Sequence, residues 1–99
     1  MIRNLPCKFS GCGLAALIIV NVPDQGVLQC ELPDIMLRSD DLNPKQLDYR
    51  IYQNYKKAVR HQIASLRTKR LIRTEKTYRG ESAQPLVLIK RNYPLNTQP

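Results

Sequence analysis

Apolar residues recur at three- and four-residue steps between positions 47 and 66, which is the clearest pattern in the chain. They share one side of a helical wheel, together with one glutamine: Leu47, Ile51, Tyr55, Ala58, Val59, Gln62, Ile63 and Leu66. This spacing predicts an amphipathic helix, since residues three and four apart lie on one helical face. Asn43 before Pro44 is typical of an N-cap followed by a proline in the first turn. We therefore expect a helix from Pro44 towards Arg70, either unbroken or as two helices with a bend.

The pattern changes after this helix. Residues 73–78 alternate and are rich in Thr and Tyr, which favours a strand. Residues 79–85 contain Gly80 and Pro85 and are typical of a loop, and the apolar run 86–89 favours a second strand. The sequence thus predicts a basic helix followed by a two-stranded hairpin with a long tip.

The first half of the chain predicts shorter elements. Residues 13–22 form either a helix or a buried strand, and an Ala-Ala-Leu sequence within them favours the helix. Residues 23–26 have the composition of a turn, and residues 27–30 are expected to be extended. Residues 32–38 predict a helix with Pro33 in its first turn.

A chain of 99 residues has room for one small domain. We expect an irregular segment at 1–12, the domain at 13–91 and a polar tail at 92–99. The apolar run Leu14–Val20 is shorter than the roughly 20 residues that cross a bilayer. It resembles a signal-peptide core, but no small-x-small cleavage pattern follows it. We therefore expect the run to be part of the folded core, and no membrane partner.

Charge divides the chain into two unlike parts. Sixteen Lys and Arg against eight Asp and Glu give a net charge of +8. Residues 45–91 hold thirteen bases and three acids, a net charge of +10, whereas the remaining residues have a net charge of −2. Such an excess favours a polyanionic partner, nucleic acid before an anionic membrane surface, and argues against a cationic substrate.

The side of the long helix opposite its apolar stripe is basic. Arg can form hydrogen bonds with both O6 and N7 of guanine, and Gln can do the same with N6 and N7 of adenine. We therefore expect four side chains of this face to read base edges in a major groove: Arg50, Gln53, Lys57 and Arg60. Four further cations are expected to meet phosphates: Lys56, Arg67, Lys69 and Arg70. Lys76 and Arg79 of the hairpin are expected to reach the adjacent minor groove or backbone. The alternative is that this basic face binds no ligand and is a solvated surface that keeps the protein soluble.

Residues 59–74 resemble the end of a winged helix-turn-helix domain. The resemblance rests on Leu66, the polar residues 68–70 and the apolar pair Leu71-Ile72 that enters a strand. It implies an α+β fold of about three helices followed by a two-stranded wing at residues 73–78 and 86–90, with residues 23–30 as a small strand between the first two helices. It also implies sequence-specific binding of double-stranded DNA, transcriptional regulation and a possible homodimer.

Other chemistries find little support in the sequence. Cys7, Cys12, Cys30 and His61 match no regular zinc spacing, and an odd number of cysteines favours a reducing compartment. No phosphate loop, nucleophile elbow or paired-carboxylate motif is present, so we expect neither an enzyme nor a cofactor. Two alternatives to a DNA-binding regulator stay open: an RNA-binding structural protein of ribosomal type, and a winged-helix protein–protein adaptor. We expect a cytoplasmic location, at the nucleoid, or a nuclear one in a eukaryote or virus.

Overall fold

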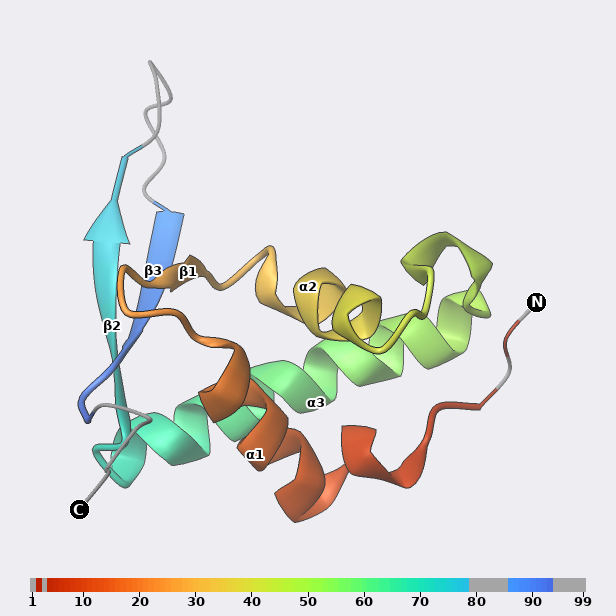
Figure 1. Cartoon of the computed structure of the whole chain (residues 1–99), viewed down its shortest axis with the longest axis horizontal. Helices are drawn as coiled ribbons and strands as arrows, with labels where there is room; N and C mark the ends of the chain where they lie inside the picture. Colours follow the sequence, from red (N-terminus) through yellow and green to blue (C-terminus); the bar gives the residue numbers. More distant parts are fainter. Residues whose placement is uncertain (1, 3, 79–85, 94–99) are drawn as a thin grey trace.

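A computed structural model describes residues 2, 4–78 and 86–93 of the chain. It contains the predicted α+β fold, with three α-helices and a three-stranded antiparallel sheet (Figure 1). The helices and strands follow one another as α1 (Gly11–Asn21), β1 (Val27–Leu28), α2 (Leu32–Ser39), α3 (Tyr49–Thr68), β2 (Ile72–Thr77) and β3 (Leu86–Arg91). Two short 3-10 turns, η1 (Cys7–Phe9) and η2 (Pro44–Gln46), precede α1 and α3. The order of the elements fits a small winged-helix-like arrangement.

The sheet stands at the end of α3 (Figure 1). Strands β2 and β3 form the predicted hairpin, in a register that pairs Thr74 with Ile89. Strand β1 adds a third strand on the other side of β3, so the order is β1-β3-β2. The sheet therefore has one strand more than the expected two-stranded wing, and this strand comes from the segment expected to be extended.

Helices α1 and α2 both pack against α3, and the core lies between these helices and the sheet. The stripe predicted for α3 supplies four buried side chains: Tyr55, Val59, Ile63 and Leu66. Ile72 of β2 and Ile89 of β3 close the core on the sheet side. This agreement follows from the helical period, because the same spacing that predicts the helix fixes which of its sides is buried.

Two tyrosines of α3 attach α2 to it. The Tyr55 hydroxyl donates to the buried Pro33 carbonyl over 2.8 Å, and the Tyr52 hydroxyl donates to the Asp34 carboxylate over 2.7 Å. The hydrogen bond to Asp34, with partial burial, raises the pKa of Tyr52 to about 12. Both phenols therefore stay protonated at neutral pH and hold the first turn of α2 against α3.

The predicted beginning of the long helix at Pro44 is wrong. Asn43 caps η2 instead, where its side chain accepts from the Lys45 backbone N–H over 3.0 Å. Leu47 and Asp48 are then extended, and α3 begins at Tyr49 with Asp48 as N-cap. The physical reason is a contact with the N-terminal segment: Ile2 donates to the Gln46 carbonyl, and the Asp48 N–H donates to the Ile2 carbonyl. The helix then continues unbroken to Thr68.

Helix α1 begins at Gly11, two residues before the predicted position, and confirms the helical interpretation of this segment. It carries no charged residue. Leu14 and Ile18 are buried in the core, whereas Ala16 and Val20 are exposed, Val20 by 61%. Among the described residues, no helix is both long and apolar enough to cross a membrane.

Candidate nucleic-acid interface

One flank of α3 carries the central group of predicted contact residues, which we call the basic flank: Gln53, Lys56, Lys57 and Arg60. At about 100° per residue, Lys56 and Arg60 lie one turn apart beside the buried stripe. Lys57 lies farther round the helix, on the solvent side. Gln53 and Lys56 are half-buried, and Lys57 and Arg60 are exposed. The helix thus presents three cations and one amide on a single continuous surface.

These cations have no carboxylate partner among the residues that the structure describes. The ion pairs between described residues lie elsewhere: Lys8 pairs with Asp40, Glu75 pairs with Arg73 and Lys90, and Arg91 pairs with Asp24. Lys56 has a weaker partner, because its Nζ lies 4.6 Å from the centroid of the Tyr52 ring. The charge of the basic flank is therefore available to an external anion.

The other predicted α3 contacts lie at its two ends. Arg50 is exposed in the first turn, and three exposed cations follow one another where the helix passes into β2: Arg67, Lys69 and Arg70. Arg70 adopts a left-handed conformation with φ of 64°, and its carbonyl accepts from the Asn92 side chain over 2.8 Å. With a rise of about 1.5 Å per residue, Arg50 and Arg67 are about 26 Å apart along the axis. The predicted residues therefore form a central group and two end groups.

The hairpin places Lys76 on the side of the sheet that faces the helices. Side chains of directly opposed residues project from the same face. Lys76 is opposite Val87, and its face also carries the buried Ile72 and Ile89. Lys76 therefore lies on the face that is turned towards α3. The predicted contact Arg79 lies outside the described residues.

The opposite face of the hairpin carries an ion cluster. Glu75 lies between Lys90, at 3.2 Å, and Arg73, at 3.3 Å. The hydrogen bond with Lys90, and to a smaller extent the one with Arg73, holds the pKa of the Glu75 carboxyl below its usual range. These two cations are partly neutralised within the hairpin, unlike those of the basic flank.

Arg91 is a structural residue although it belongs to the basic half of the sequence. Its side chain is only 7% exposed. The guanidinium donates from Nε to the Val22 carbonyl over 2.7 Å and pairs with Asp24. These contacts attach the end of β3 to the turn that follows α1. The positive charge counted from the sequence is therefore larger than the positive charge that is available to a ligand.

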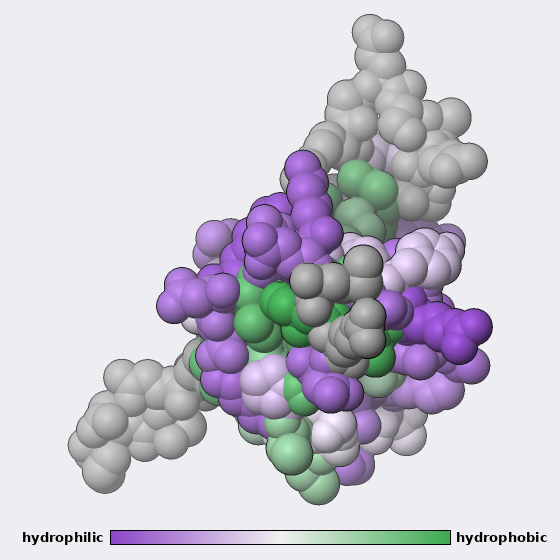
Figure 2. All heavy atoms as spheres, turned by 90° about the vertical axis from the view of Figure 1, so that its right-hand side faces the viewer, coloured by the Kyte–Doolittle hydropathy of each residue, from purple (hydrophilic) through white to green (hydrophobic). Residues whose placement is uncertain are grey.

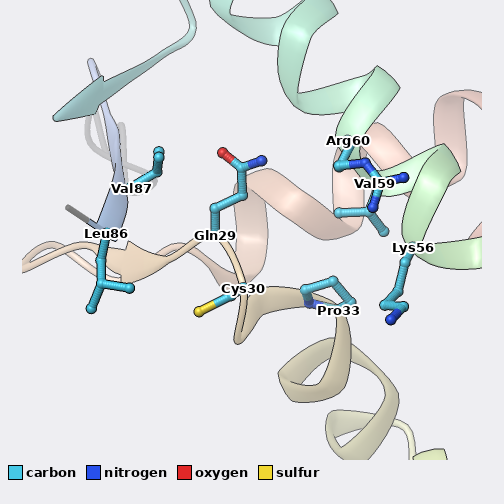
Figure 3. A pocket seen from close by; sticks show the side chains of 8 residues that line it. All are labelled: Gln29, Cys30, Pro33, Lys56, Val59, Arg60, Leu86 and Val87. Atoms are coloured by element: carbon cyan, nitrogen blue, oxygen red, sulfur yellow. The ribbon is translucent and has the colours of Figure 1, made fainter. Parts of the chain in front are cut away.

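A pocket of about 410 Å³ opens beside the basic flank (Figure 3). Three parts of the fold line it, namely α3, the segment from β1 to the start of α2, and the beginning of β3: Gln29, Cys30, Pro33, Lys56, Val59, Arg60, Leu86 and Val87. This pocket was not predicted from the sequence. Gln29 and Val87 are distant from α3 in the sequence, and only the sheet pairing brings them to it.

The cysteines and the histidine of the described residues lie outside the basic flank as exposed side chains. Cys7, Cys12 and Cys30 are free and exposed, and His61 is exposed on α3. No group of three His, Cys, Asp or Glu side chains in that part of the chain is arranged to hold a metal ion.

The end of the molecule where α3 begins is mainly polar: hydrophilic side chains cover most of it around a smaller hydrophobic area (Figure 2).

Comparisons of the chain with protein-family models, curated proteins and solved structures found no match.

Proposed function

We propose that the chain is a winged-helix protein that binds double-stranded DNA and acts as a transcriptional regulator. The observation that supports this proposal is the basic flank, whose cations have no carboxylate partner among the described residues. Because the major groove is about 12 Å wide, it admits one helix. An exposed helical face that carries Arg, Lys and Gln is suited to it.

The length of α3 suggests that its cations contact different parts of the DNA. A helix of 20 residues is about 30 Å long and exceeds the width of the groove. The basic flank would then meet base edges, with Arg60 suited to guanine and Gln53 to adenine. Arg67 at one end would meet phosphates, as expected from the sequence, and Arg50 at the other end, which was expected to read a base edge, would here meet a phosphate as well. Lys76, on the face of the hairpin turned towards α3, would contact the adjacent backbone.

Fluorescence anisotropy with a labelled mixed-sequence duplex and a structured RNA, both at 150 mM salt, tests this proposal. We expect the duplex to bind more tightly. Arg60→Gln is expected to weaken duplex binding by about tenfold or more, because a good bidentate base contact contributes about 1–3 kcal/mol. Lys8→Gln is the matched control, since it removes the same charge from a side chain that is paired with Asp40.

Three outcomes would contradict the proposal. Tighter binding of the RNA would favour the RNA-binding alternative, and binding of neither polymer at low salt would favour a protein–protein adaptor. An equal loss in Lys8→Gln and Arg60→Gln would mean that only the overall charge matters. Selection of a preferred site from a random duplex library would test sequence specificity, and sedimentation equilibrium would test the predicted homodimer.

A further inference from the structure

The pocket beside the basic flank combines apolar walls with a cationic edge (Figure 3). Leu86 and the exposed Val87 of β3 supply apolar surface, and the buried Val59 of α3 and Pro33 of α2 lie at the floor of the pocket. In Figure 3 the Gln29 side chain extends into the space between β3 and α3. The pocket has a volume of about 410 Å³, which is within the range of small-molecule sites. Such sites are mostly apolar and contain a few well-placed polar groups.

The cationic edge defines the charge of a suitable ligand. Lys56 and Arg60 are one helical turn apart and both line the pocket, and neither pairs with a carboxylate among the described residues. A guanidinium binds a carboxylate through two parallel hydrogen bonds, and a nearby ammonium adds attraction. Gln29 can add a further hydrogen bond to a polar substituent. The apolar walls in turn favour a ligand with a compact hydrocarbon body.

We propose that this pocket binds a small amphipathic anion, an aromatic or similarly compact apolar body that carries one carboxylate. The carboxylate lies against Arg60 and Lys56, and the apolar body lies against the β3 residues Leu86 and Val87, above the buried Val59. Because Lys56 and Arg60 also belong to the basic flank, the bound anion competes with DNA. Binding of the anion does not depend on the proposed function, whereas the competition rests on it.

Isothermal titration calorimetry of the full chain with 2-naphthoate tests the site directly, without DNA. We expect saturable binding with one site per chain, and much weaker binding of the neutral 2-naphthol and of acetate, which lack one half of the required chemistry. Arg60→Gln is expected to weaken 2-naphthoate binding by about tenfold or more, as expected for a lost charged hydrogen bond. Lys57→Gln is the matched control, because Lys57 has the same charge and neighbours the site but does not line the pocket.

A substitution on the opposite wall tests the location independently. Val87 is an exposed residue of β3, so Val87→Asp is expected to leave the fold intact while its carboxylate repels the ligand. Amide NMR spectra of each variant verify the fold. Absence of 2-naphthoate binding at millimolar concentration, or equal weakening by Lys57→Gln and Arg60→Gln, would overturn the proposed site.

Displacement of a labelled duplex by 2-naphthoate tests the competition separately. Displacement that Arg60→Gln abolishes would support it, whereas a duplex that stays bound at saturating 2-naphthoate would overturn it. If 2-naphthoate binds but no duplex does, the proposed function fails and the anion site stands.

Discussion

At the scale of single residues, the most informative side chain is Tyr55. Its ring lies in the core, in edge-to-face contact with Phe9 at a centroid distance of 5.8 Å. Its hydroxyl supplies the hydrogen bond to the buried carbonyl of Pro33. Burial raises the pKa of this phenol, with a smaller contribution from Asp34, and this keeps the donor in place. Tyr55 therefore combines an apolar contact with a polar one that orients α2.

Tyr55→Phe is expected to lower the free energy of unfolding by about 1–3 kcal/mol. The ring would still fill the core, but the Pro33 carbonyl would lose its partner inside the protein. Urea denaturation followed by circular dichroism measures the change. Tyr49→Phe is the matched control, since Tyr49 is 76% exposed, and its effect should stay within about 0.5 kcal/mol. Equal stability of Tyr55→Phe and the unsubstituted protein would show that the hydrogen bond orients α2 without stabilising it.

At the scale of elements, the start of α3 depends on Asp48. Its carboxylate accepts from the Arg50 backbone N–H over 2.9 Å, which satisfies one of the free donors of the first turn. Asp48→Ala is therefore expected to lower the free energy of unfolding by about 1 kcal/mol in urea denaturation. Asp48→Asn keeps an acceptor and should lose much less. A similar loss in both variants would indicate that the charge of Asp48, rather than its capping geometry, stabilises the helix.

The beginning of α3 also shows where prediction from the sequence stops. The period of the apolar residues gave the correct buried side, because that pattern is local. The Asn43-Pro44 signal correctly indicates a cap, but the cap belongs to the short turn η2. What separates η2 from α3 is the pairing of the backbone with Ile2, more than forty residues earlier in the sequence. Such a contact leaves no trace in local spacing.

The hairpin should respond to pH through Glu75. Its pKa is lowered by Lys90 and Arg73, so the stabilisation is complete above the carboxyl's ordinary value of 4.5 and is lost as the pH falls through the lowered one. Glu75→Gln should therefore melt at a lower temperature than the unsubstituted protein at pH 7, and the difference should vanish near pH 2. Thermal denaturation at the two pH values measures it. A difference that does not change with pH would mean that the substitution acts through packing.

At the scale of the whole molecule, sequence and structure divide the charge differently. The sequence places a net charge of +10 on residues 45–91. The structure separates this excess into paired cations, such as Arg91 and Lys90, and cations without a carboxylate partner in the described part of the chain, such as Lys57 and Arg60. Helical spacing predicted a basic side of α3 opposite its apolar stripe, and the contact of this side with nucleic acid stays a prediction. The pocket was not predictable, because its walls meet only when β3 pairs with β1 beside α3.

The separation of paired and unpaired cations leads to a prediction about salt. Binding of duplex DNA releases counterions from each neutralised phosphate, so the affinity falls with salt in proportion to the number of such contacts. If six contacts form, the affinity should fall roughly a thousandfold between 50 and 200 mM salt. Arg67→Gln should weaken all duplex sequences alike and reduce the slope of log affinity against log salt by about one, whereas Lys8→Gln should leave it unchanged. Anisotropy titrations at several salt concentrations measure these slopes. An affinity that is insensitive to salt would contradict a phosphate-bound α3, because cations without carboxylate partners would then take no part in binding.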